Sequence, residues 1–352
     1  MNRYLNPFQG KPKPLQVVGL FLISPEVLMK LVGMPVSKLF TDAGMSSELK
    51  TLEHIRAGRR KPNIELFAKI LEDFPHSEKN HFLECITKAN SGDAEAFLQL
   101  ISSTWKMAAI GSKHYHGEEY YHLKFMTRIE DEFRSGIKIW FQGDRVGATK
   151  NFVANESLSP FLWPSIIELI IKSNSENELK IAQLAITLEI AISLFSAIEI
   201  QNGKAKTGML FLKLLPTQKK QRNPISCFTF WLKKQLHAKT LSELLNHEAL
   251  RRLEIDESTV KRWSSGKGIP DKNLIIKIAE HWDTEEERNE IYAIYVGMLY
   301  MNFIGYYWHK LQTCTSENAH LPYEQNTFED WVNLRYPYWY QFHKTRYEAE
   351  HI

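Results

Sequence analysis

Apolar side chains recur three and four positions apart through most of the chain, which is the spacing of one face of an α-helix. In its middle, this pattern predicts helices over residues 94–109, 118–134, 164–172 and 177–200. Residues 137–142 are interpreted as one short strand, and residues 143–158 as a loop. The pattern as a whole therefore predicts an all-α protein.

Two short helices joined by a glycine turn are predicted between residues 256 and 282. Asp256 is placed to cap the first, which would begin at Glu257 and bury Val260 and Trp263 before ending around Gly266. The second would turn these apolar residues inward: Leu274, Ile275, Ile278, Ala279 and Trp282. The outer face of the first helix then carries Glu257, Ser258, Lys261 and Arg262. A short polar helix supported by an apolar one suits the major groove of DNA.

The stretch from Thr259 to Pro270, TVKRWSSGKGIP, resembles the recognition helix and following turn of the lambda-repressor/Cro-like helix-turn-helix family. Upstream, TLSELL at 240–245 resembles that family's Thr-Gln-x-x-Leu-Ala start of the preceding helix, with Thr240 and Glu243 placed as a capping box. One departure is that the segment from Leu244 to Trp263 is longer than the family's spacing by about five residues and lacks a turn glycine.

The resemblance implies double-stranded DNA as the partner. It assigns base contact to the exposed residues Glu257, Ser258, Lys261 and Arg262, because Arg can bridge guanine O6 and N7 and Glu can accept from cytosine N4. It assigns phosphate contact to Lys267 and to the backbone N–H groups around Ser265 and Gly266. The alternative is a helix-turn-helix that serves only for packing or dimerisation.

An internal repeat indicates a second, divergent copy of this unit near the start of the chain. Gly58 and Pro62 lie 208 positions before Gly266 and Pro270. At this offset Thr51, Leu52, Ile55, Lys69, Ile70 and Phe74 align with Thr259, Val260, Trp263, Lys277, Ile278 and Trp282. The copy would end in a helix with these residues facing inward: Ile64, Phe67, Ile70, Leu71 and Phe74. Its candidate phosphate contacts are Lys50, Arg56, Arg59, Arg60 and Lys61, with a solvated charged face as the alternative.

Charge and cysteine content narrow the class of protein. Residues 213–282 hold fourteen Lys/Arg against seven Asp/Glu, whereas residues 283–352 hold five against eleven, which favours a localised polyanion site. The three cysteines are far apart and odd in number, so neither a disulfide framework nor a paired-cysteine metal site is expected, and a cytoplasmic location fits. Residues 181–200 are long enough to span a membrane, but Gln183, Glu189 and Glu199 favour a core helix.

Few residue patterns suggest catalysis or cofactor binding. The metal-like cluster His114, His116, Glu118, Glu119 and His122 is better explained as a polar helix start. No glycine-rich phosphate loop, Gly-x-Ser-x-Gly or Cys-His spacing of a known kind occurs, so we expect no enzyme, cofactor or metal. The aromatic residues between Tyr300 and Tyr347 are expected to form a core or a subunit interface of a homodimer, because their segment is acidic.

The sequence thus predicts an all-α cytoplasmic protein with two lambda-repressor-like modules flanking a helical central domain. The expected divisions are 1–75 for an arm and the first module, 76–222 for the central domain, 223–282 for the second module and 283–352 for a helical C-terminal domain. The expected function is sequence-specific DNA binding, in a transcriptional regulator of a bacterium, phage or mobile element. The alternatives are a protein-interaction scaffold, and a nucleic-acid-processing or defence factor.

Overall fold

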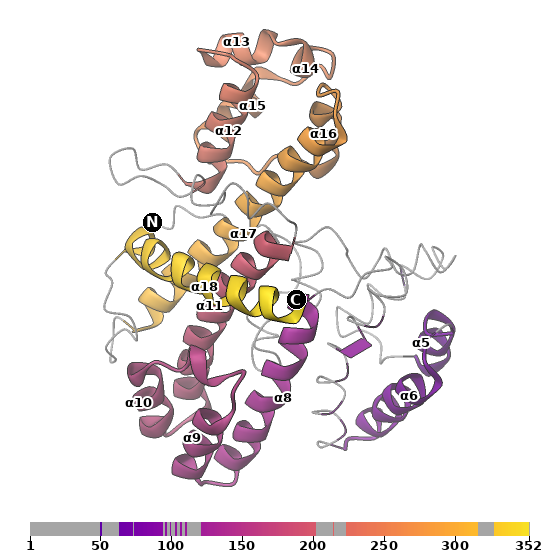
Figure 1. Ribbon diagram of the computed structural model, residues 1–352, viewed down its shortest axis with the longest axis vertical. Coiled ribbons are helices and arrows are strands. Elements are labelled where there is room, and N and C mark those ends of the chain that lie inside the picture. The colour runs from indigo at the N-terminus through magenta and orange to yellow at the C-terminus, as the bar shows by residue number, and fades with distance from the viewer. Residues whose placement is uncertain are drawn as a thin grey trace. The chain divides into compact units, whose positions relative to one another are not determined.

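The computed structural model describes residues 50, 63–72, 74–93, six helical positions between 96 and 110, 121–201, 214, 223–315 and 327–351. Every regular element in these ranges is a helix, which confirms the all-α expectation for the described chain (Figure 1). The chain divides into two compact units at Ile190 and Ala191, within a helix. The two units are described separately below.

The unit that ends at Ile190 contains seven described elements, the last of which continues into the other unit. They are α5 (Ile64–Ile70), α6 (His76–Asn90), α8 (Tyr121–Phe141), α9 (Arg145–Ala154), the short 3-10 helix η2 (Ser159–Phe161), α10 (Pro164–Lys172) and α11 (Glu176–Gln201). Helices α10 and α11 lie within one residue of the ranges expected from apolar spacing.

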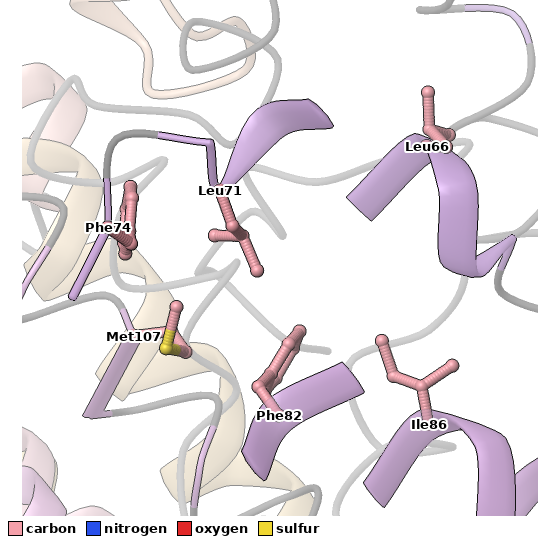
Figure 2. Packing of buried hydrophobic residues seen from close by; sticks show 6 residues of the cluster. All are labelled: Leu66, Leu71, Phe74, Phe82, Ile86 and Met107. Carbon is pink, nitrogen blue, oxygen red and sulfur yellow. The ribbon is translucent and has the colours of Figure 1, made fainter. Parts of the chain in front are cut away.

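Helices α5 and α6 pack on each other around a small apolar cluster (Figure 2). Leu71 and Phe74 are buried there, as expected, but Ile64 is 37% exposed while Leu66 is buried, so the prediction that Ile64 faces inward is wrong. Asn63 caps α5 by accepting a hydrogen bond from the Glu65 N–H at 2.9 Å, so the helix begins at Ile64. The side chain of Ile70 lies outside the described residues.

Helix α8 continues to Phe141, so the strand predicted over residues 137–142 is wrong. The predicted loop over residues 143–158 is also wrong, because Asp144 caps α9 by accepting from the Gly147 N–H at 2.7 Å. The two helices pack closely where a Cβ on Gly136 would lie 2.0 Å from the Phe152 ring. Apolar spacing missed α9 because its buried side consists mainly of small or polar residues, Ala148 and Thr149 beside Phe152.

The apolar segment of α11, residues Ile181–Ile200, has the length and composition of a membrane-spanning helix, yet 94% of its apolar window is buried within the protein. Glu189 and Glu199, which interrupt the apolar run, are 0% and 1% exposed. This burial agrees with the expectation of a core helix.

The unit that begins at Ala191 contains the rest of α11 and seven further helices. They are α12 (Pro224–Gln235), α13 (Leu241–Asn246), α14 (Glu248–Arg251), α15 (Glu257–Ser264), α16 (Lys272–Ala279), α17 (Glu285–Thr315) and α18 (Phe328–His351). Helix α12 packs on both α15 and α17, and α16 packs on α17, so α12 and α16 connect the α12–α16 group to α17 (Figure 1).

The aromatic residues of α17 and α18 form much of this unit's core. Trp308 stacks on Trp331 with ring centroids 4.9 Å apart, and Tyr300 stacks on Phe195 of α11 at 4.9 Å. The Tyr336 hydroxyl donates to the Glu199 carboxylate, and burial, together with this carboxylate, raises the pKa of the tyrosine well above its ordinary value. These contacts agree with the expected aromatic core. Helix α18 contains Pro337 and lies within the segment predicted to form a helical C-terminal domain.

Candidate nucleic-acid interface

Helix α15 has one buried edge and one exposed face. It begins at Glu257, as expected, and buries Val260 and Trp263, which are 0% and 3% exposed. Asp256 occupies the N-cap position, where its carboxylate accepts from the Ser258 hydroxyl, and this hydrogen bond holds the pKa of Asp256 below its ordinary value. The tryptophan therefore anchors α15 in the group of helices that includes α12.

The four residues predicted to contact bases all lie exposed on α15: Glu257, Ser258, Lys261 and Arg262. Glu257 and Lys261 form an ion pair one turn apart, with 2.9 Å between Oε1 and Nζ and both side chains 62% exposed. Because such exposed pairs contribute little to stability, a partner can replace this one at small cost. The structure thus brings the predicted base-contact residues together on one short helix.

The turn after α15 is closed by backbone hydrogen bonds. The Gly266 N–H donates to the Trp263 carbonyl at 2.9 Å, and the Lys267 N–H donates to the Arg262 carbonyl at 2.8 Å. This paired arrangement is a Schellman motif, and it needs a left-handed residue, which Gly266 supplies at φ +70°. The Ser265 N–H also donates within the helix, to Lys261 at 3.0 Å. The side chains of Ser265 and Lys267, both exposed, are therefore the groups of this turn best placed for phosphate.

Asn223 fastens the start of α12 to the turn that follows α15. Its side-chain Nδ2 donates to the Gly266 carbonyl at 2.8 Å, and its Oδ1 accepts from the Ser226 N–H at 3.0 Å as the N-cap of α12. Sequence reasoning missed this residue. Its signal is the dipeptide Asn223-Pro224, because Asn at the N-cap followed by Pro at the first helical position is a typical helix start.

The preceding helix, α13, starts with the predicted capping box. The Thr240 hydroxyl accepts from the Glu243 N–H at 3.1 Å. The Glu243 carboxylate accepts from the Lys239 N–H at 2.7 Å, and this bond lowers the pKa of Glu243. In a capping box the Glu side chain bonds back to the backbone at the helix start, and here Glu243 bonds to the N–H of Lys239, the residue before Thr240.

The extra residues between Leu244 and Trp263 form a helix of their own, α14. His247 caps it by accepting from the Ala249 N–H at 3.2 Å. The guanidinium of Arg252 donates to the Lys277 carbonyl at 3.2 Å, which ties the end of α14 to α16. Glu254, at φ +50°, makes the left-handed turn into α15 at a place where no glycine occurs. The insertion is thus folded into the helical module.

Helix α16 follows α15 after a short connection and packs on α17. Asp271 caps α16 by accepting from the N–H groups of Asn273 and Leu274 at 2.9 and 3.2 Å. Ile275, Ile278 and Ala279 are buried as expected, while Leu274 and Trp282 are half-buried. The buried hydroxyl of Tyr295 on α17 donates to the Pro270 carbonyl at 3.0 Å, which holds the residues between α15 and α16.

Further cations lie on α12 and α14, where sequence reasoning assigned no contact. Lys233 and Lys234 lie over the Phe230 ring at 5.2 and 5.0 Å, and Lys233 also donates to the Lys239 carbonyl at 2.8 Å. Arg251 is exposed on α14. The basic surface of the α12–α16 group is therefore wider than α15 alone.

The remaining predicted residues belong to the other compact unit or lie outside the described residues. Lys50 is exposed and belongs to the other compact unit. Arg56, Arg59, Arg60 and Lys61 lie outside the described residues, as do His114, His116, Glu118, Glu119 and the side chain of His122. Within the described residues, no group of three His, Cys, Asp or Glu could hold a metal ion. Comparison with protein-family models, curated proteins and solved structures finds no match to the chain.

Proposed function

We propose that the chain is a sequence-specific double-stranded DNA-binding protein in which α13–α15 act as a helix-turn-helix of the lambda-repressor/Cro kind. Helix α15 is the recognition helix. The supporting observation is its exposed face of four polar residues, placed opposite a buried Val260 and Trp263. This arrangement presents hydrogen-bonding groups outward from a rigidly anchored helix, as direct readout of base edges requires.

The dimensions of α15 support the same proposal. Its eight residues give about two turns, and an α-helix with its side chains is about 10–12 Å across, which fits the major-groove width of about 12 Å. The guanidinium of Arg262 is the strongest candidate for a guanine contact because it can donate two parallel hydrogen bonds to O6 and N7. Its stem lies against Gly268, where an added Cβ would be 3.2 Å from the Arg262 Cβ, so the turn guides the direction of the side chain. By occupying promoter DNA, such a protein would regulate transcription.

The test is duplex binding measured against salt, followed by selection of bound sequences from a random duplex pool. The affinity for random DNA should fall steeply as salt rises, because phosphate contacts release counterions. The selected pool should then converge on a common sequence. Lys172→Ala is the control variant, since Lys172 is exposed on α10 in the other unit and should leave the salt slope unchanged.

A second candidate is a protein-interaction scaffold that keeps the helical module without DNA contact. It is favoured by the contacts that the polar residues of α15 make with one another: Glu257 forms an ion pair with Lys261, and Asp256 accepts a hydrogen bond from Ser258. Under this alternative, the salt slope would be flat and no sequence would be enriched. The same two measurements therefore separate the candidates.

A further inference from the structure

The exposed residues of α15 form a regular array on one side of the helix. At about 100° per residue, all four fall within an arc of about 140°. They are Glu257, Ser258, Lys261 and Arg262. The buried Val260 and Trp263 lie on the opposite side. The half-buried Thr259 and Ser264 lie at the two borders of the array. The four exposed side chains are therefore the ones that face the bases if α15 enters the major groove.

The chemistry of this array matches G·C base pairs. In the major groove guanine presents the two acceptors O6 and N7, and cytosine presents its N4 amino donor. Arg262 supplies a pair of donors for guanine, and Glu257 supplies an acceptor for cytosine. Adenine is read best by Asn or Gln, and thymine by an apolar contact with its methyl group. Helix α15 contains neither Asn nor Gln, and its apolar residues Val260 and Trp263 are buried while Thr259 is half-buried. The exposed array thus lacks the side chains that best select A·T pairs.

Glu257 discriminates more sharply than the other three residues. A carboxylate accepts hydrogen bonds but cannot donate them, so it is repelled by guanine O6 and N7 and by thymine O4. It is also repelled by adenine N7, which lies beside the N6 amino group. Cytosine presents its N4–H beside a hydrogen bonded to carbon, so a carboxylate meets this base edge without repulsion. Glu257 therefore favours cytosine and opposes the other three bases.

The ion pair with Lys261 makes this carboxylate usable close to phosphates. The Lys261 Nζ lies 2.9 Å from the Glu257 Oε1, so it offsets a negative charge that DNA would otherwise repel. A carboxylate has two oxygens with about four acceptor sites, so it can bind the ammonium and a cytosine N4–H at the same time. The ion pair therefore need not break when cytosine is bound.

Arg262 lies along the turn that follows α15. A Cβ on Gly268 would lie 3.2 Å from the Arg262 Cβ and 3.3 Å from its Nε. Gly268 does not have the positive φ that favours glycine, so the close approach of Arg262 is the feature that explains a glycine here. Within the described part of the chain the guanidinium has no ion-pair partner, so its parallel donors are available to guanine.

We propose, on the basis of the DNA-binding function proposed above, that α15 reads G·C base pairs at the centre of its half-site, with Glu257 selecting cytosine and Arg262 selecting guanine. These two residues are five positions apart, which is about 7.5 Å along the helix axis. This distance is a little over two base-pair steps of about 3.4 Å. The two G·C pairs therefore lie within about three successive base pairs.

The first measurement is the sequence that the full chain selects from a random duplex pool. The selected motif should contain the cytosine and the guanine within about three base pairs of each other. Replacing this cytosine by another base should weaken binding roughly tenfold. N4-methylcytosine at the same position should weaken it to a similar extent, because the methyl group takes the place of the amino hydrogen that Glu257 accepts.

Glu257→Gln tests the assignment of this residue, because glutamine can bond to both N6 and N7 of adenine. The variant should change the preference at one base pair from cytosine to adenine and lose the sensitivity to N4-methylcytosine. Glu248→Gln is the matched control. Glu248 is exposed at the first position of α14, as Glu257 is at the first position of α15, so its replacement removes the same charge from a helix start. Base preference should stay unchanged in this control.

The outcomes separate this inference from the function on which it rests. A selected motif of A·T pairs, or a cytosine preference that persists in Glu257→Gln, would overturn the inference while DNA binding stands. An affinity change in Glu257→Gln that is equal for all four bases would do the same, because it would limit Glu257 to stabilising the helix start. A flat salt slope with no enriched sequence would overturn the proposed function and this inference together.

Discussion

Gly266 meets two separate requirements at the end of α15. Its φ of +70° lies in the left-handed region, and a Cβ there would lie 2.2 Å from the Asn223 Oδ1. Since the same amide side chain donates to the Gly266 carbonyl, any side chain at this position would disturb the contact that fastens the turn to α12. Backbone conformation and tertiary contact thus select glycine independently.

Gly266→Ala should therefore destabilise the protein by more than the conformational cost of a left-handed alanine, which is about 1–2 kcal/mol. Gly92→Ala is the matched control, because Gly92 has φ +96° and no atom within 4 Å of the added Cβ. Denaturant unfolding of both variants measures the difference. Equal losses would mean that the Asn223 contact contributes nothing to the choice of glycine.

Arg262→Ala should lower the affinity for the selected DNA site by roughly 1–3 kcal/mol and relax preference at one base pair. Lys267→Ala should instead weaken binding to all sequences alike, since a lysine beside the turn would contact phosphate. Affinities for the selected site and its single-base variants, at matched salt, distinguish the two. If Arg262→Ala binds the selected site as tightly as the unchanged protein, the recognition role assigned to this residue is wrong.

At the scale of the element, the best-predicted helices are those with a cap or a long apolar run. The predicted capping box at Thr240 marks the start of α13. A second capping box starts α17, where the Glu287 N–H donates to the Thr284 hydroxyl at 3.3 Å. The errors fall where packing overrides spacing. Helix α9 exposes Val146 and Val153 at 56% and 49%, so its apolar residues point away from the core. A periodicity argument cannot find such a helix.

The candidate site was predictable to a similar extent. The spacing of Val260 and Trp263 identifies the buried edge of α15. In a helix of eight residues, the buried edge also determines which residues are exposed on the opposite face. The contact between Asn223 and Gly266 joins positions 43 apart and carries no local periodic signal. Helix α14 is too short for periodicity to detect. Local sequence patterns therefore predict the longer helices of the site. The hydrogen bonds between distant positions can be identified only from the structure.

Trp263→Ala should destabilise the protein by about 3–5 kcal/mol, because it leaves a cavity at the buried edge of α15. DNA binding should be lost with the fold of this helix. Ile276→Ala is the control, since Ile276 is 41% exposed on α16 and its replacement should change stability by no more than about 0.5 kcal/mol. Thermal unfolding with helicity as the readout compares the two. An unchanged midpoint in Trp263→Ala would mean that the indole is not packed as described.

A buried histidine on α18, which contacts α11, makes the stability of the protein depend on pH. His343 is 0% exposed, its Nε2 lies 2.6 Å from the Ser193 Oγ, and burial lowers its pKa to about 3. Between pH 3 and about 6.5 this histidine is protonated in the unfolded state but neutral in the folded state. The free energy of unfolding is therefore highest above about pH 6.5 and decreases as the pH falls toward 3. The slope is at most about 1.4 kcal/mol per pH unit.

His343→Gln should remove this slope, so that the free energy of unfolding changes less between pH 7 and pH 5 than in the unchanged protein. Chemical denaturation at each pH gives the measurement. His247→Gln is a useful comparison, because partial burial lowers the pKa of His247 in the same direction at a site on the α12–α16 surface. A slope that persists fully in His343→Gln would contradict the role given to this residue.

Over the whole molecule, the internal repeat raises the question of how two modules would share DNA. The second copy has Lys261 and Arg262 where the first has Glu53 and His54, and its wider surroundings add Lys233, Lys234 and Arg251. The equivalent turn of the first copy, residues 58–62, lies outside the described residues, so its role stays a prediction. The distribution of charge favours the second copy as the main contributor to affinity.

Neutralising Arg59, Arg60 and Lys61 together should lower the salt slope of binding by up to about three units while keeping base preference at the main half-site. Neutralising Lys261, Arg262 and Lys267 should abolish specific binding. Duplex affinity against salt for both triple variants is the measurement. A greater loss from the first set would reverse the assignment of the main DNA-reading module.

The contact between Asn223 and the Gly266 carbonyl also sets practical limits for dissecting the protein. A fragment that begins at Pro224 would lack the amide that closes the turn, and one that stops before Tyr295 would lack the hydroxyl that holds the Pro270 carbonyl. A minimal piece for spectroscopy or crystallisation must therefore begin at or before Asn223 and include α17 beyond Tyr295. The smallest piece that preserves the geometry of α15 is thus longer at both ends than the segment 256–282 in which the sequence predicts this helix.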